Sequence, residues 1–304
     1  MRIALAGVGD VGSYFIEEFH KSDHEVVVLT RKEKDLAKSL GICQRITTYT
    51  ADDLFYNIRD CDAVVSTIGG LSDDYVRAHD ALLQACIRSD KCKRFIPSEW
   101  TINIEDFPDQ PLYSGKARHD WRDKLKEQKE IKYTFVCNGW FAEYIFPLNR
   151  RYLGDVGAGF PVEHGTKRFH VYGDGRQRVT LTSARDVARA ALAILSYEGD
   201  WPQYTHIAGE TLTYLELYDI MKQHDNAWTK QTILFSTLFD RIAAAKRHGM
   251  SYSEPALALL GFMRCNEVSE EKRLVWGEGI LEGVQARGIK RLLKQADERP
   301  DENP

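Results

Sequence analysis

Short apolar segments alternate with longer segments of helical spacing along the first half of the chain. The apolar segments are rich in β-branched residues, which favours buried strands. The expected strands are Ile3–Ala6, Glu25–Thr30, Arg45–Tyr49, Ala63–Thr67, Arg94–Pro97 and Tyr133–Cys137. The expected helices include Val11–Lys21, Asp73–Ser89 and Lys116–Gln128. Apolar strands that alternate with helices are typical of a covered parallel sheet, so we predict an α/β fold with a doubly wound parallel sheet.

The pattern changes after about residue 150. Lys167–Tyr172 and Gln177–Thr182 flank Gly173-Asp174-Gly175, which predicts a hairpin or a bulged turn. Asp186–Tyr197 is an alanine-rich helix, and Tyr204–Ala208 is expected to return to the sheet as an extra strand. The rest is predicted to be mostly helical, at Thr213–His224, Thr229–His248, Glu254–Phe262 and Glu267–Lys294.

Composition excludes several classes of protein. The 304 residues are 43% hydrophobic and 28% charged, as in ordinary globular domains. A net charge of −4 lacks the basic excess of a nucleic-acid binder, so no nucleic-acid partner is expected. No apolar run is long enough to span a membrane, and the N-terminal run is too short for a signal peptide. The six cysteines form no CxxC pair, so we expect reduced thiols and a cytoplasmic location.

A glycine-rich segment joins the first expected strand to the first expected helix. Its sequence, Gly7-Val8-Gly9-Asp10-Val11-Gly12, is the G-x-G-x-x-G of a Rossmann dinucleotide-binding loop. The glycines allow a tight turn and close approach of the pyrophosphate, which the amino end of the helix attracts. We therefore assign cofactor contacts to Gly7, Gly9, Asp10, Val11 and Gly12.

The end of the second strand indicates which dinucleotide binds. NAD sites usually have an acid there, about 20 residues after the loop, to bond the ribose. This chain has Thr30-Arg31-Lys32 instead, and two cations suit the 2′-phosphate of NADP(H). Small residues after the fourth strand leave room for a cofactor to cross. The predicted cofactor is NADP(H), with contacts from Arg31, Lys32, Thr67, Ile68 and Gly69.

Further motifs carry a family resemblance. Arg94-Phe95-Ile96-Pro97-Ser98-Glu99-Trp100 resembles the RF-x-PSEF-G segment of the NmrA-like, isoflavone-reductase-like branch of the atypical short-chain reductases. Lys116-Ala117-Arg118 falls where that branch has a K-A-x-V-R-R helix, and Asn138-Gly139-Trp140-Phe141 where it has an S-N-x-F-A turn. The resemblance covers most of the chain and includes the Gly173-Asp174-Gly175 turn and Ser183-Ala184-Arg185-Asp186-Val187-Ala188.

This resemblance implies NADPH-dependent reduction of a small, often phenolic molecule by hydride from the nicotinamide. It implies that Lys116 is the catalytic lysine, serving as general acid or base. Tyr113 is a second candidate proton donor, although it precedes Lys116 by three residues and not by the four of the ordinary Tyr-x-x-x-Lys pair. The same motifs assign cofactor contacts to Ser98, Glu99, Lys116, Asn138 and Gly139.

The chain departs from the family on the substrate side. Trp100 and Thr101 replace a phenylalanine and a glycine, and the helix reads Arg118-His119-Asp120-Trp121-Arg122 in place of the V-R-R ending. These changes leave the substrate and the reaction type open. We expect an apolar pocket for a flat substrate, lined by Trp100, Trp140, Phe141 and Tyr144.

The histidines do not indicate a metal site. His20 and His24 are four residues apart, but no carboxylate or cysteine completes a ligand set. His164 and His170 flank a loop-to-strand stretch from which they could reach a pocket mouth, but a structural role is favoured. No bound metal is predicted.

These features predict an NADP-binding Rossmann domain at residues 1–150, to which residues 183–208 return. Residues 151–182 and 209–295 form a smaller, mostly helical substrate-binding part, and the charged tail at 296–304 is expected to be disordered. The predicted function is an NADPH-dependent reductase of a small aromatic or secondary-metabolite-like molecule, acting as a monomer or homodimer. Two alternatives stay open: a non-redox isomerase or cyclase that opens an epoxide or ether, and an NADP(H)-sensing regulatory protein without turnover.

Overall fold

A computed structural model describes residues 1–70, 73–108, 116–251 and 253–304 of the chain. A six-stranded sheet with the order β3-β2-β1-β4-β5-β6 forms its centre. The strands are β1 (Arg2–Ala6), β2 (Glu25–Thr30), β3 (Cys43–Ile46), β4 (Ala63–Ser66), β5 (Arg94–Ile96) and β6 (Lys132–Tyr133). Every neighbouring pair runs parallel, which confirms the predicted doubly wound parallel sheet.

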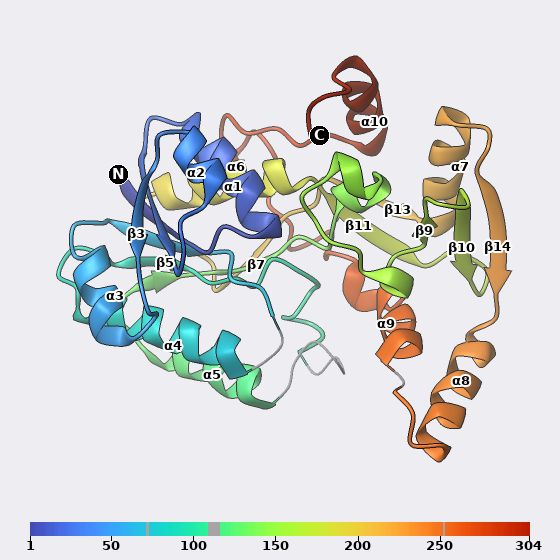
Figure 1. The fold of residues 1–304 in the computed structure, drawn as a ribbon, viewed down its shortest axis with the longest axis horizontal. Coiled ribbons are helices and arrows are strands. Elements are labelled where there is room, and N and C mark those ends of the chain that lie inside the picture. The colour runs from blue at the N-terminus through green and yellow to red at the C-terminus, as the bar shows by residue number, and fades with distance from the viewer. Residues whose placement is uncertain (71–72, 109–115, 252) are drawn as a thin grey trace.

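Helices cover both faces of this sheet (Figure 1). They are α1 (Asp10–His20), α2 (Asp35–Ser39), α3 (Ala51–Ile58), α4 (Asp73–Arg88), α5 (Lys116–Glu127) and α6 (Ala184–Ser196). The alternation along β1 shows why two layers form. Ile3 and Leu5 are buried in the core that includes α1 and α6, whereas Ala4 and Ala6 are buried in the core that includes α3, α4 and α5.

The six-stranded sheet and the helices that cover it form the first lobe of the molecule. One further strand pair extends this lobe. β7 (Phe135–Cys137) follows β6 and pairs in parallel with β12 (Tyr204–His206). The strand predicted at 204–208 is therefore present, and α6 packs against α1 as part of the same lobe. Among the described residues, no helix is both long and apolar enough to cross a membrane.

The second lobe contains two three-stranded sheets, with the orders β14-β10-β9 and β13-β11-β8. Its strands are β8 (Trp140–Phe141), β9 (Val162–Glu163), β10 (Arg168–Tyr172), β11 (Arg178–Thr182), β13 (Glu210–Thr213) and β14 (Thr229–Ile233). Its helices are α7 (Tyr214–His224), α8 (Phe235–Arg247), α9 (Ser253–Gly261) and α10 (Ile289–Glu298), with 3₁₀ turns η1 (Ala142–Ile145), η2 (Leu148–Arg150), η3 (Gly157–Gly159) and η4 (Arg264–Asn266). A further 3₁₀ turn, η5 (Gly279–Leu281), packs against α6 instead. This part of the chain is less helical than predicted.

Of the two alternatives predicted at Gly173-Asp174-Gly175, the hairpin is wrong, because β10 and β11 belong to different sheets. Gly173 and Gly175 have φ angles of 64° and 71°, which glycine adopts without strain, and they turn the chain from one sheet to the other. β10 pairs in parallel with β14, whereas β11 pairs antiparallel with β13. Pairing with distant strands therefore overrides the local hairpin signal.

Two predicted helices also need correction. The helix expected at Thr229–His248 begins only at Phe235, because residues 229–233 form β14 and pair with β10. Much of the helix expected at Glu267–Lys294 is absent as well. The backbone N–H of Leu274 donates to the carbonyl of His206, so this stretch runs beside β12, and α10 begins at Ile289.

The disorder predicted for residues 296–304 is wrong. Residues 296–298 complete α10, and two arginine side chains donate hydrogen bonds to backbone carbonyls between residues 296 and 303. Arg150 Nη2 donates at 2.9, 3.2 and 3.3 Å to the carbonyls of Ala296, Arg299 and Glu302. Arg185 Nη2 donates to the carbonyl of Asn303 at 2.9 Å. The tail composition favours disorder, but these donors come from η2 and α6, far away in the sequence.

Candidate functional site

The glycine loop turns sharply between β1 and α1. Gly7 has a φ angle of 89°, in the region that favours glycine. A Cβ on Gly12 would lie 2.5 Å from the Gly7 carbonyl oxygen and 2.7 Å from Thr67 Oγ1, so only glycine lets α1 begin this close to the loop. No atom lies within 4 Å of a Cβ position on Gly9. The loop is therefore open at Gly9, beside the positive end of α1.

A cleft of about 560 Å³ lies at the carboxyl ends of β1, β2 and β4. The predicted cofactor contacts that line it are Gly7, Gly9, Arg31, Lys32, Thr67, Ile68 and Gly69. Lining residues that the sequence did not reveal include Lys34, Tyr49, Asp74 and Tyr75. Ligands of open α/β sheets bind at this edge, so the cleft is the candidate dinucleotide site.

Tyr49 forms part of the cleft wall beside the cations that end β2. The Arg31 guanidinium lies 5.5 Å from the centre of the Tyr49 ring. The Tyr49 hydroxyl donates to the carbonyl of Leu29 at 2.7 Å, which fixes the ring. Burial raises the pKa of Tyr49, so the hydroxyl stays protonated. No motif marks Tyr49, because its place depends on the loop that follows β3.

Asp10 was predicted to contact the cofactor, but its carboxylate bonds the second lobe. Asp10 Oδ2 accepts the backbone N–H of Gly154 at 2.9 Å. Nearby, the N–H of Tyr152 donates to the Tyr14 hydroxyl at 3.0 Å. Val11 is half-buried on α1 and packs against the core. The Asp10 bond thus fastens the chain after η2 to the glycine loop.

Glu99 was also predicted to contact the cofactor, but it is fully buried and bonds to other side chains. Its carboxylate accepts bonds from Arg118 Nε at 3.1 Å, Arg122 Nε at 3.2 Å and the Tyr75 hydroxyl at 3.0 Å. Burial alone raises the pKa of Glu99, but the charges and hydrogen bonds of the two arginines outweigh it and lower the pKa to about 2. Glu99 is therefore an ionised anchor for α5.

Ser98 lies beside this anchor and contributes its backbone. Its carbonyl accepts the Tyr75 hydroxyl at 2.9 Å and Arg118 Nη2 at 3.1 Å. Its N–H donates to His79 Nε2 at 3.2 Å, and burial lowers the pKa of His79 to about 4, which keeps the imidazole neutral.

The two predicted catalytic residues lie at the edge of the described structure. α5 begins at Lys116, so the backbone of Lys116 opens the helix as predicted, but its side chain lies outside the described part. Tyr113 also lies outside the described residues.

Asn138 and Gly139 form the turn between β7 and β8, and neither is among the described residues that line the cleft. Asn138 is fully buried, and its amide donates to the Gly139 carbonyl at 3.1 Å. Gly139 has a φ angle of 68°, and a Cβ there would lie 2.3 Å from the carbonyl oxygen of Thr180. The turn therefore packs tightly on β11, and its expected cofactor contact does not follow from this geometry.

The aromatic residues predicted to line a substrate pocket separate into two groups. Trp100 is only 7% exposed, its Nε1 donates to the Ser66 carbonyl at 2.7 Å, and its ring packs on Phe15, so it belongs to the core. Phe141 is equally buried in the same core. Trp140 and Tyr144 are half-buried instead, with ring centres 5.4 Å apart, and both contact the ring of Phe160.

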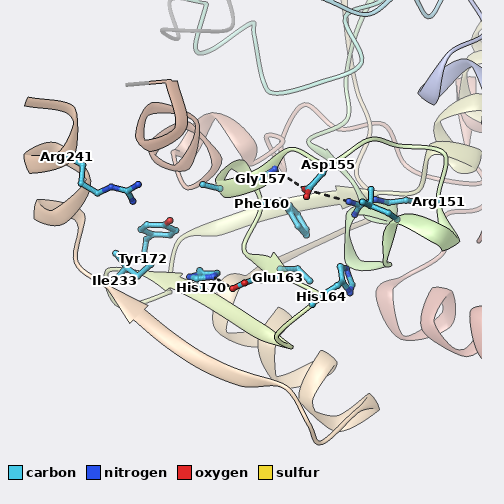
Figure 2. A pocket seen from close by; sticks show the side chains of 14 residues that line it. Arg151, Asp155, Gly157, Phe160, Glu163, His164, His170, Tyr172, Ile233 and Arg241 are labelled. Carbon is cyan, nitrogen blue, oxygen red and sulfur yellow. Dashed lines mark hydrogen bonds and ion pairs between the residues drawn. The ribbon is translucent and has the colours of Figure 1, made fainter. Parts of the chain in front are cut away.

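Phe160 lines a second cavity of about 440 Å³ in the second lobe (Figure 2). His170 Nε2 and Glu163 Oε2 lie 3.2 Å apart in its wall, and Tyr172 and Arg241 line the same space. His164 also lines it, and burial lowers the pKa of His164. Among the described residues, no group of three or more His, Cys, Asp or Glu side chains is placed to hold a metal ion.

Comparisons with known proteins give a consistent result. The model of the NmrA-like family matches residues 2–257. The chain is 33% identical to oxidoreductase swnR of Arthroderma benhamiae, over 99% of both chains. It is 27% identical to isoflavone reductase homolog A622 of Nicotiana glauca, over 61% of both. The structure of leucoanthocyanidin reductase from Vitis vinifera, solved with NADPH, superposes on this chain with a TM-score of 0.73. The match covers 97% of this chain and 99% of that one at 17% sequence identity, so the two proteins share the fold.

Proposed function

The chain belongs to the NmrA-like family, and we propose that it is an NADPH-dependent oxidoreductase that reduces a small organic molecule. The cleft at the carboxyl ends of β1, β2 and β4 carries this proposal. It combines an open glycine loop with two cations at the end of β2, where an NAD site has an acid. The names of the relatives, an oxidoreductase and an isoflavone reductase homologue, support reductase chemistry.

The residues of the cleft fit NADPH. The open backbone at Gly9 and the amino end of α1 suit the pyrophosphate. Arg31 and Lys32 bind the 2′-phosphate, and the Tyr49 ring supplies an aromatic surface for the adenine. When bound there, NADPH supplies the hydride.

We place the substrate, an aromatic or secondary-metabolite-like molecule, toward the second lobe. One wall of the second cavity includes Asp155 and Gly157, in the segment that Asp10 fastens to the glycine loop through Gly154. Phe160 and Tyr172 offer ring faces to a flat molecule, and the His170–Glu163 pair offers polar recognition. Behind Phe160, Trp140 and Tyr144 support the wall.

Lys116 is proposed to move the proton that accompanies the hydride. The support is its place as the first residue of α5, a helix held by the buried carboxylate of Glu99. A positioned acid or base typically contributes about 10²–10⁴-fold to the rate. Tyr113 remains a second candidate donor.

Cofactor titration of Arg31→Ala tests the proposal. A hydrogen bond to a charged group contributes about 1.5–3 kcal/mol, so NADPH should bind about 10- to 150-fold more weakly. NADH binding should barely change, because NADH has no 2′-phosphate. Arg59→Ala is the matched control: it removes the same charge from an exposed position that does not line the cleft. Equal weakening for NADPH and NADH would overturn the assignment.

A further inference from the structure

A cluster of buried side chains joins the wall of the dinucleotide cleft to α5. We define the Glu99 cluster as Glu99, Arg118, Arg122, Tyr75 and His79. Tyr75 and His79 come from α4, Glu99 follows β5, and the two arginines lie one turn apart on α5. All five side chains are buried, yet Tyr75 also lines the cleft. The cluster therefore touches the candidate cofactor site at one end and α5 at the other.

The two arginines of the cluster make different contacts. Both bond the Glu99 carboxylate through Nε and Nη2, at 3.1 and 3.2 Å for Arg118 and at 3.2 and 3.4 Å for Arg122. Arg118 also donates to the Ser98 carbonyl at 3.1 Å and to the Gly70 carbonyl at 3.3 Å. Its guanidinium carbon lies 3.9 Å from the centre of the Tyr75 ring. Arg118 thus contacts the cleft wall, whereas the bonds described for Arg122 end at Glu99.

Tyr75 has little freedom to move independently of Arg118. Its hydroxyl donates to the Ser98 carbonyl at 2.9 Å and lies 3.0 Å from Glu99 Oε1. Its ring stacks on His79 with the centres 3.9 Å apart. A ligand that presses on Tyr75 or on the loop at Gly69 and Gly70 is therefore opposed by groups that also hold Arg118.

We propose that Arg118, oriented by Glu99, is a positioning residue that couples occupancy of the dinucleotide cleft to the placement of α5, the helix that opens at Lys116. The inference rests on the proposed function, because it takes NADPH as the occupant. NADPH in the cleft restrains Tyr75 and the Gly70 carbonyl, and through Arg118 it restrains the first turns of α5. Arg118 lies two positions after Lys116, with only Ala117 between them, so the same restraint fixes the backbone that carries the proposed acid or base.

The chemistry of arginine suits this role. The planar guanidinium presents five N–H donors, so it bonds Glu99, Ser98 and Gly70 together while its face lies on Tyr75. The ammonium of a lysine is one compact centre, which does not span these acceptors. Arg118→Lys should therefore keep the charge and lose the coupling.

Hydrogen exchange of α5 amides, with and without saturating NADPH, tests the proposal. The wild type is compared with Arg118→Met and with Arg122→Met, a matched control because each variant leaves Glu99 with one arginine partner. NADPH affinity is titrated for each protein, so that each is measured at saturation. We expect NADPH to slow exchange in α5 of the wild type and of Arg122→Met, and this protection to be lost in Arg118→Met. Equal protection of α5 in both variants would overturn the coupling.

The outcomes also separate this inference from the proposed function. Absence of NADPH binding in the wild type overturns both. NADPH binding that slows exchange in α4 and leaves α5 unchanged overturns the coupling alone. If Arg118→Met does not fold, the Arg118→Lys and Arg122→Lys pair gives the same comparison with both charges retained.

Discussion

Glu99 and Glu143 are both fully buried, and their surroundings favour opposite protonation states. Glu99 faces two guanidinium groups, and its pKa falls to about 2. Glu143 accepts the Ser183 hydroxyl at 2.7 Å and the N–H of Ala184 at 2.8 Å, at the amino end of α6. Burial nevertheless raises the pKa of Glu143 to about 7. Two neutral donors, a helix end and the charge of Arg287 beyond Ser183 thus do not compensate for desolvation as two directly bonded guanidinium groups do.

The difference separates a carboxylate that bonds two guanidinium groups beside the cleft from one that bonds only neutral donors in the core. The Glu99 cluster anchors α5 to the wall of the cofactor site, so changes there should alter function as well as stability. Glu143 lies in η1 and caps α6, which packs on α1 behind the sheet. Changes at Glu143 should therefore appear in stability and its pH dependence alone.

The largest effect is expected at the end of the helix that Glu99 anchors. Lys116→Ala should lower turnover by about 10²–10⁴-fold at saturating NADPH, because the proton donor or acceptor is lost, while the melting temperature holds. Lys124→Ala, an exposed lysine on the same helix that pairs with Asp80, is the control and should keep full activity. The measurement is product formation alongside the absorbance of the reduced nicotinamide.

The same assay distinguishes the alternative functions. Product without loss of NADPH would indicate an isomerase or cyclase that uses the same lysine. Absence of turnover with every candidate substrate, alongside tight NADPH binding, would favour a sensor. Full activity in Lys116→Ala would contradict the assignment of Lys116.

The next largest effect concerns stability. Glu99→Gln removes the buried carboxylate that Arg118 and Arg122 share and should reduce the free energy of unfolding by about 3–5 kcal/mol. Glu143→Gln should cost only about 1 kcal/mol at pH 7, because a neutral side chain replaces one that is already partly protonated. Urea unfolding of the two variants measures the difference. Similar losses would mean that the two buried sites do not differ as their charges indicate.

The smallest effect is a pH dependence. The pKa of Glu143 is raised from its usual 4.5 to about 7, so between these values the folded protein binds more protons than the unfolded chain. The contribution of Glu143 to stability is therefore full below pH 4.5 and is lost as the pH rises through 7, by about 3 kcal/mol in total. Glu99 acts in the opposite sense, because its stabilisation is full above pH 4.5 and is lost as the pH falls through 2.

Unfolding at a series of pH values from 4.5 to 8 checks this prediction. Wild-type stability should fall more steeply with rising pH than that of Glu143→Gln. Parallel curves for the two proteins would show that Glu143 does not titrate in this range.

Local patterns were sufficient for the first lobe and for part of the cleft. The strands of a parallel sheet are apolar on both faces, so β1, β2 and β4 were recognisable as short β-branched segments. The glycine loop and Arg31 were recognisable because the turn chemistry and the charge at a strand end are properties of consecutive residues. Tyr49 and Tyr75 were not recognisable as cleft residues. Tyr49 reaches the cleft from the loop after β3 and Tyr75 from α4, and no sequence motif indicates where these segments lie.

The sequence by itself determined the doubly wound sheet, the position of the glycine loop and the cations that follow β2. Only the tertiary structure decided that β10 and β11 enter different sheets and that the tail is held by Arg150 and Arg185. It also decided that the buried carboxylate of Glu99 bonds Arg118 and Arg122 of α5. The physical reason is the range of each interaction: strand and turn propensities act between neighbours, whereas the partner of a buried charge or an edge strand comes from wherever the chain folds back.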